Sequence, residues 1–333
     1  MKCINKKRLL CLFVIAAIFM SGCGSKDVVS YENPYNVYET TLSYGMATSI
    51  NSTNHLFFSE EKGLIVLDDI NLGQESESVH SSVAVAAGTF NLATDTITFS
   101  QNIYDKMFPA STTKIMTCYL ALKYGDLNDY VTISKNAADQ PSDASICHVN
   151  EGDVISLNDL LYGLMLASGN DAAIAIAEHI SGSVDAFVEL MNEEAIAMGA
   201  SCTHFDNPHG MPSAEHYTSV YDLYIIFKNA IENEKFVEII NTSTYTATIT
   251  NIKGNARERS WDNSNRFMTG RTDSPEGFTV VGGKTGTTGE AGYCLVMLSK
   301  NSSEQPIISI VLKADGRSNL YLLTREILQE FNN

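Results

Sequence analysis

Two side chains with the spacing of a nucleophile and its base lie at the start of an apolar helical segment. They are Ser111 and Lys114, which follow Pro109. Residues three apart share a face at the start of a helix, so we expect the hydroxyl and the amine to meet. Lys114 can accept a proton only when neutral, so burial and a neighbouring cation must lower its pKa well below about 10.4. The backbone N–H of Ser111 lacks an intrahelical partner and could receive an oxyanion.

Two further polar motifs could complete such a site. Ser168-x-Asn170 lies between two apolar helical stretches, and Lys-Thr-Gly-Thr occupies 284–287 at the end of a strand-like run. The glycines before this segment let another backbone approach closely, as an edge strand requires when it pairs with a substrate. Lys284 is the cation expected beside Lys114. Each motif alone is weak, because Ser-x-x-Lys is common by chance and a polar junction can simply be a turn.

The elements that must position these motifs are a mixture of helices and strands. Helices are predicted after Ser111, behind a capping box that begins at Ser156, after Asn170 and over 320–331. Strands are predicted at 83–90, 96–99, 245–252, 278–284, 293–298 and 307–312. Because these strands flank a mostly helical middle, the sequence predicts an α+β fold.

The first 23 residues resemble a bacterial lipoprotein signal. A basic start precedes an apolar run at 9–20, which is shorter than a membrane-spanning helix needs. The run leads to Ser21-Gly22-Cys23, so we expect 1–22 to be removed and Cys23 to be acylated. A plain cleaved signal peptide is the alternative. The polar stretch 23–63 is predicted to be a tether, so the protein would work outside the cytoplasm, anchored to the cell membrane by lipid.

The composition and the pattern of histidines exclude some classes of binding partner and cofactor. The formal net charge of −17 argues against nucleic acid, because its phosphates would be repelled. The histidines form no His-Glu-x-x-His pattern, and His204 and His209 are expected to make structural hydrogen bonds, so neither a metal nor another cofactor is expected. Four cysteines outside the signal are predicted to be structural, although disulfides are permitted outside the cell: Cys118, Cys147, Cys202 and Cys294.

In this order the three motifs resemble those of the D-alanyl-D-alanine carboxypeptidases, the low-molecular-mass penicillin-binding proteins of serine peptidase family S11. The resemblance covers the chain from about residue 82 and includes 109–117, 168–173, 207–210, 216–218, 284–286 and 291–294. It implies a β-lactamase/transpeptidase-like α+β fold over 64–333, in which an antiparallel sheet is flanked by helices, with an all-helical subdomain at about 130–235. Many family members bind the membrane through a C-terminal helix; here we expect the lipid on Cys23 to do so.

The resemblance also implies a reaction. Ser111 would attack the carbonyl between the two terminal D-alanines of a peptidoglycan stem peptide, and β-lactams would acylate it as covalent inhibitors. Lys114 would take the Ser111 proton, and Ser168 would relay a proton to the leaving amine. The N–H groups of Ser111 and Thr287 would form the oxyanion hole. The residues implied to bind substrate are Asn170, Lys284, Thr285, Gly286, Thr287 and Arg317, of which Lys284, Thr285 and Arg317 would hold its free carboxylate.

Two other functions stay open. A class A β-lactamase needs a glutamate in a loop after the second motif to activate the deacylating water. That region offers only Glu189, within an amphipathic helical pattern. A penicillin-binding sensor lipoprotein without catalytic activity would not need Lys114. The intact motifs therefore favour the carboxypeptidase.

Overall fold

A computed structural model describes residues 65–66 and 79–332. The predicted signal peptide, the acylation site at Cys23 and the tether over 23–63 lie outside these residues. All described residues belong to one compact unit. Within the described ranges, none of the helices has the length and apolar character needed to span a bilayer.

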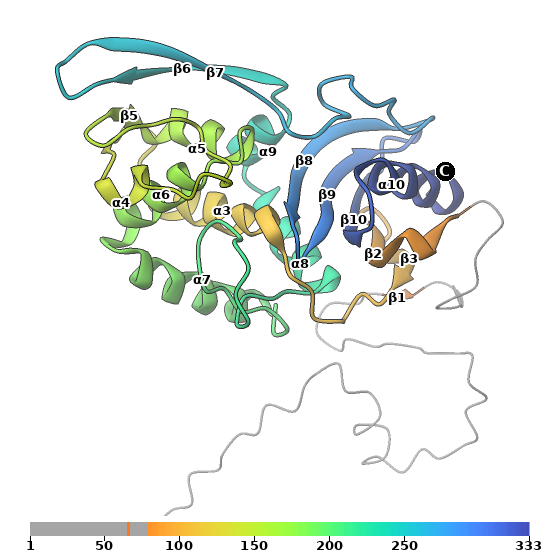
Figure 1. Ribbon diagram of the computed structural model, residues 1–333. Coiled ribbons are helices and arrows are strands. Elements are labelled where there is room, and N and C mark those ends of the chain that lie inside the picture. The colour runs from red at the N-terminus through yellow and green to blue at the C-terminus, as the bar shows by residue number, and fades with distance from the viewer. Residues whose placement is uncertain (1–64, 67–78, 333) are drawn as a thin grey trace, which may run out of the picture. The chain divides into compact units, whose positions relative to one another are not determined.

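A six-stranded sheet forms one part of the molecule (Figure 1). Its strands are β1 (Ile65–Val66), β2 (Ala84–Asn91), β3 (Thr96–Gln101), β8 (Thr279–Thr288), β9 (Gly292–Lys300) and β10 (Pro306–Ala314). They lie in the order β1-β3-β2-β10-β9-β8, and every pair except the parallel β1–β3 is antiparallel. Strand β8 is therefore an edge strand, with β9 as its sheet neighbour.

Helices cover both faces of this sheet, because its central strands carry apolar side chains on both faces. Strand β10 is an example. Alternate residues of a strand point to opposite faces. Ile308 and Ile310 join the large core that includes α8 (Val220–Ala230), while Ile307 and Val311 join a smaller core under α10 (Arg317–Phe331). A strand buried on both faces is almost continuously apolar, and the 307–312 run has this character.

The other helices form a lobe beside the sheet. They are α3 (Lys114–Tyr124), which follows the short 3-10 helix η2 (Ala110–Thr113), then α4 (Lys135–Ala138), α5 (Leu157–Met165), α6 (Asn170–Ser181), α7 (Val184–Met198) and α9 (Glu234–Ile240). A 3-10 turn η1 (Ser81–Val83) precedes β2. The predicted α+β fold, with its antiparallel sheet flanked by helices, is confirmed.

The helical lobe also carries a second sheet, which is a correction to the all-helical subdomain predicted at about 130–235. This sheet contains β4 (Tyr130–Thr132), β5 (Val154–Ser156), β6 (Thr244–Thr250) and β7 (Ala256–Asp262) in that order. Strands β4 and β5 were missed because three residues are too few to show an alternating pattern. Strand β7 was missed because its Arg-Glu-Arg stretch is polar on both faces.

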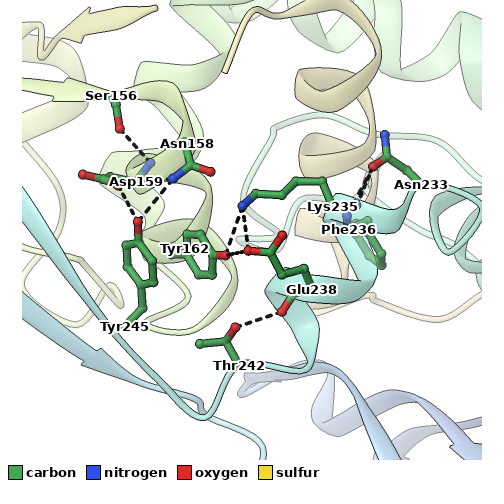
Figure 2. A network of polar contacts seen from close by, with 10 residues as sticks. All are labelled: Ser156, Asn158, Asp159, Tyr162, Asn233, Lys235, Phe236, Glu238, Thr242 and Tyr245. Atoms are coloured by element: carbon green, nitrogen blue, oxygen red, sulfur yellow. Dashed lines mark hydrogen bonds and ion pairs between the residues drawn. The ribbon is translucent and has the colours of Figure 1, made fainter. Parts of the chain in front are cut away.

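Figure 2 shows how polar contacts attach β6 to α5 and α9. The rings of Tyr162 and Tyr245 stack with centroids 3.6 Å apart. Tyr245 donates to Asp159 Oδ1 (2.6 Å), and Tyr162 donates to Glu238 Oε1 (2.6 Å), which also pairs with Lys235 (2.8 Å). The β6–β7 ribbon is thereby fixed against the lobe, and its continuation leads to the strand that carries the Lys-Thr-Gly motif.

Serine and glycine set the ends of several helices in the lobe. Ser156 caps α5 by accepting a hydrogen bond from Asp159 N (3.0 Å), the first half of the predicted capping box. Ser183 and Ser219 cap α7 and α8 in the same way. Helices α6 and α7 end at glycines with positive φ, at 182 and 199. The α5–α6 junction, where Ser168 lies, has no such side-chain cap: α5 ends at Met165 and α6 begins after Gly169.

Candidate active site

Ser111 lies in a tight turn that opens α3. Ala110, directly before it, has a φ of 48°, a left-handed conformation that residues other than glycine rarely adopt. Gly210 backs this turn so closely that a Cβ there would lie 1.8 Å from the carbonyl oxygen of Ala110. The strained turn and its glycine support fix the half-buried Ser111 one turn before Lys114.

The amine of Lys114 is buried among three oxygen atoms. Its Nζ lies 3.1 Å from Ser111 Oγ, 2.8 Å from Asn170 Oδ1 and 2.7 Å from the carbonyl oxygen of His209. A neutral amine has two N–H donors and one lone pair, and an amide or carbonyl oxygen can only accept. Asn170 and His209 therefore take the two donors. The lone pair is left directed at the Ser111 hydroxyl, as a base requires.

Burial and a second lysine favour the neutral form of Lys114. Burial lowers the pKa of Lys114 well below its ordinary 10.5, the charge of Lys284 lowers it further, and Asp171 opposes both effects. Lys284 is itself fully buried and donates to Ser168 Oγ (3.0 Å) and to the carbonyl of Thr285 (2.8 Å). Burial lowers the pKa of Lys284 to about 7. The structure thus brings all three motifs together.

The junction between α5 and α6 holds Ser168 and Asn170 in place. Ser168 is buried and has a φ of 59°, so it too is held in the left-handed region. Asp171, which the sequence did not single out, is buried beside it. Its carboxylate accepts hydrogen bonds from the backbone N–H groups of Cys147 (2.9 Å) and Val149 (3.3 Å). These backbone donors meet the hydrogen-bonding needs of the buried carboxylate, and they hold the 147–149 loop against the junction between α5 and α6.

Strand β8 presents its free edge to the Ser111 turn. Gly286 is so close to this turn that an added Cβ would lie 2.9 Å from Ser111 N and 3.1 Å from the carbonyl oxygen of Pro109. The Ser111 amide therefore faces β8, one residue from Thr287. An extended peptide could pair with this edge while its carbonyl oxygen meets the Ser111 N–H.

A methyl group at position 286 is expected to damage this arrangement. Gly286→Ala should push β8 away from the Ser111 turn, and misplacing a reacting group by about 1 Å can cost about 10²-fold in rate. The measurement is the second-order rate of covalent labelling by penicillin. Gly289→Ala is the matched control, because a Cβ at 289 meets nothing within 4 Å. Equal labelling of the two variants would contradict the close approach.

One residue that contacts the motifs escaped the sequence analysis. Ser264 Oγ lies 2.6 Å from Thr285 Oγ1, and Ser264 N donates to the carbonyl of Leu166 (3.2 Å) at the end of α5. The signal that could have drawn attention to it is the Asn-Ser-Asn run that follows Trp261. Short polar runs of this type form turns, and turns can carry exposed hydroxyls.

Two other residues considered in the sequence lie apart from the lysine cluster. Arg317 is exposed at the start of α10, with its guanidinium carbon 5.7 Å from the centre of the Tyr293 ring. Tyr293 pairs with Thr287 in the β8–β9 ladder, so Arg317 reaches from α10 over β9, the strand next to β8, and its role stays a prediction. Glu189 is exposed within α7, as predicted, and gives no support to the β-lactamase alternative.

The histidines and cysteines make structural contacts. His209 Nδ1 accepts a hydrogen bond from Met211 N (3.2 Å), and burial lowers the pKa of His209 to about 3. No cluster of three or more metal-binding side chains exists among the residues that the structure describes. In the same ranges the cysteines are unpaired. Cys118, Cys147 and Cys294 are buried, and Cys202 is partly buried.

Comparison with known proteins decides the family. Residues 73–316 match the Peptidase S11 family model, described as D-alanyl-D-alanine carboxypeptidase. This chain belongs to the S11 family. S11 relatives include the D-alanyl-D-alanine carboxypeptidase DacF of Bacillus subtilis, 34% identical over 70% of this chain and 57% of DacF. Another is the D-alanyl-D-alanine carboxypeptidase of Streptomyces sp. strain K15, 33% identical over 68% of this chain and 80% of that protein.

The fold agrees with this S11 membership. The crystal structure of the Streptomyces K15 DD-transpeptidase superimposes with a TM-score of 0.68 and 31% identity, covering 74% of this chain and 96% of that one. The fold is therefore of the β-lactamase/transpeptidase type that the sequence implied. The chain spans little more than half the length of DacF.

Proposed function

We propose that this protein is a serine-type D-Ala-D-Ala carboxypeptidase that removes the terminal D-alanine from peptidoglycan stem peptides through an acyl-enzyme on Ser111. The observation that carries the proposal is the buried Lys114 amine, whose Nζ lies 3.1 Å from Ser111 Oγ and also contacts Asn170 Oδ1 and the His209 carbonyl oxygen. In its neutral form this amine can donate to the latter two oxygens and direct its lone pair at Ser111. A sensor acylated by penicillin would use the same base, so release of D-alanine is the property that separates the enzyme from a sensor without catalysis. Membership of the S11 family supports the choice of substrate.

The acylation step follows from these contacts. Lys114 takes the proton of Ser111 while Oγ bonds to the carbonyl carbon of the penultimate D-alanine. The backbone N–H groups of Ser111 and Thr287 stabilise the resulting oxyanion. The C–N bond then breaks, and Ser168 relays a proton to the leaving amine. Water hydrolyses the ester in a second step and frees Ser111, while a β-lactam leaves a ring-opened adduct that reacts slowly.

Substrate binding uses the edge of β8. The peptide lies along Gly286 and Thr287. Asn170 turns its Oδ1 to Lys114, so its NH₂ group is the part that meets a substrate carbonyl. Lys284 and Thr285 bind the free carboxylate, a pairing of cation and anion that gives strong hydrogen bonds. Arg317 adds positive charge from the start of α10.

We also propose where the enzyme works. Residues 1–22 are a lipoprotein signal, Cys23 carries the lipid, 23–63 are a tether and 64–333 are the peptidase domain. The basic and apolar N-terminal run that ends at Ser21-Gly22-Cys23 supports this assignment. The peptidase would thus act outside the cytoplasm, held at the membrane that borders its cell-wall substrate.

Labelled penicillin tests the proposed function most directly. The purified protein is incubated with the label, digested, and the modified peptide identified; modification of Ser111 is expected. In parallel, an acylated tripeptide that ends in D-Ala-D-Ala should release free D-alanine. Labelling elsewhere, or no D-alanine release, would reject the carboxypeptidase. Rapid turnover of the penicillin without a lasting adduct would instead indicate a β-lactamase.

The lowered lysine pKa values predict a bell-shaped pH dependence. On the acid side, kcat/KM should fall as Lys114 takes up a proton and ceases to be a base. On the alkaline side it should fall as Lys284, with a pKa of about 7, loses the charge that binds the carboxylate. A bound carboxylate raises the pKa of Lys284, so the alkaline limb of kcat should lie at higher pH. Initial rates of D-alanine release between about pH 5 and about pH 10 check this, and coincident alkaline limbs would contradict it.

A further inference from the structure

An exposed serine beside Thr285 is held more rigidly than its exposure suggests. Ser264 lies between two buried asparagines, Asn263 and Asn265. Asn263 donates to the carbonyl of Thr242 (2.9 Å) and accepts from Asn265 N (2.9 Å), and Asn265 accepts from Phe267 N (3.1 Å). Such side-chain turns fix the backbone on both sides. The Ser264 hydroxyl is therefore presented from a rigid support.

Ser264 joins the two walls of the site at one end. Its N–H donates to the carbonyl of Leu166, two residues before Ser168 in the helical lobe. Its hydroxyl lies 2.6 Å from the hydroxyl of Thr285 on β8. Directly before Thr285 comes Lys284, whose amine contacts both Ser168 and the Thr285 carbonyl. Ser264 thus lies at the end of the site where the buried cation is found.

The chemistry of this hydroxyl pair suits an anion. Each hydroxyl has one donor, and in a mutual hydrogen bond only one of the two donors is used between them. When a carboxylate arrives, both hydroxyls can donate to it, and hydrogen bonds to a charged oxygen are about twice as strong as neutral ones. The Lys284 amine supplies the opposite charge nearby. An uncharged ester or amide would gain much less from this group.

We propose that Ser264 is a specificity-determining residue that shares with Thr285 the binding of the free α-carboxylate at the substrate's C-terminus. This inference rests on the proposed function and adds a residue outside the three motifs to it. The turns at Asn263 and Asn265 favour carboxylate binding by the Ser264 and Thr285 hydroxyls. They already fix the backbone around Ser264, so little conformational freedom is lost when the carboxylate binds. Ser264 selects peptides that end in a free carboxylate over peptides whose C-terminus is blocked.

The test compares a charged ligand with its neutral counterpart. The second-order rate of Ser111 acylation is measured with benzylpenicillin and with its methyl ester, for the wild type and Ser264→Ala. Removing one charge-assisted hydrogen bond should reduce the rate with benzylpenicillin about 10-fold and leave the rate with the ester unchanged. Ser264→Thr, which keeps the hydroxyl, should restore the preference. Ser260→Ala is the matched control, because Ser260 is exposed on β7 and its hydroxyl pairs with Thr246.

The outcomes separate this inference from the proposed function. A selective loss with benzylpenicillin, restored in Ser264→Thr, supports it. An equal loss of acylation rate with both ligands would mean that Ser264 only maintains the structure. No loss of rate would mean that Thr285 and Lys284 suffice to bind the carboxylate. Either result overturns the inference. If the wild type is not labelled at Ser111 at all, the proposed function fails first. Thermal unfolding of each variant checks that the fold is retained.

Discussion

Replacement of Ser111 by alanine is expected to abolish both D-alanine release and covalent penicillin labelling. The reason is that Ser111 Oγ forms the bond to the acyl group in both reactions, and the methyl group of alanine cannot form it. Loss of a catalytic serine costs roughly 10⁴-fold or more in kcat, with the remainder due to binding and the oxyanion hole. Release of D-alanine from the tripeptide and gel detection of labelled penicillin provide the two measurements.

The Ser111→Ala variant should fold normally, because the change removes one half-buried hydroxyl and leaves the Ala110 turn intact. Ser302→Ala, in the exposed turn between β9 and β10, is the matched serine control and should retain full activity. Labelling that persists in Ser111→Ala, or D-alanine release near the wild-type rate, would show that another nucleophile is used.

Replacement of Lys114 by arginine should be nearly as damaging, although arginine keeps a long side chain with nitrogen donors. A guanidinium does not lose its proton at accessible pH, so it cannot accept one from Ser111. General-base catalysis contributes about 10²–10⁴-fold, and the acylation rate should fall within this range. The rate of penicillin acylation is the measurement, since it isolates the step in which Lys114 acts.

A second substitution keeps the Lys114 prediction testable if arginine does not fit the buried site. Lys114→Met is similar in length and uncharged, and it removes the base without burying an unpaired cation. We expect Lys114→Met to remain folded and to be as slow in acylation as Lys114→Arg. Substantial acylation by either variant would mean that a different group takes the Ser111 proton.

The parts of the site that the sequence could predict are those set by local periodicity. Ser111 and Lys114 had to meet if a helix began there, and the side chain of Ser156 had to cap a helix. The apolar runs of β9 and β10 were evident because strands buried on both faces have little polar sequence. These features depend on a few neighbouring residues, so they can be inferred without knowledge of the fold.

The parts that could not be predicted depend on contacts between distant segments. Nothing near Ser264 in the sequence indicates that its hydroxyl would meet Thr285. The buried carboxylate of Asp171 is explained only by the 147–149 loop that it binds, and the positive φ of Ala110 only by the approach of Gly210. Strand β7 similarly exists because β6 pairs with it, since its own sequence has weak strand character.

The pairing of β2 with β10 has a consequence for how the protein is made. Ala84 lies opposite Ala314, so the centre of the sheet closes only after the chain has been synthesised as far as residue 314. Until then β2 and β3 form an open ribbon whose unpaired edge invites aggregation, and such long-range closure is slow. Lys284 is also synthesised long after Ser111, so Ser111 cannot become reactive in a chain that ends before Lys284. Penicillin reactivity should therefore report completed folding, and truncated or stalled chains should remain unlabelled.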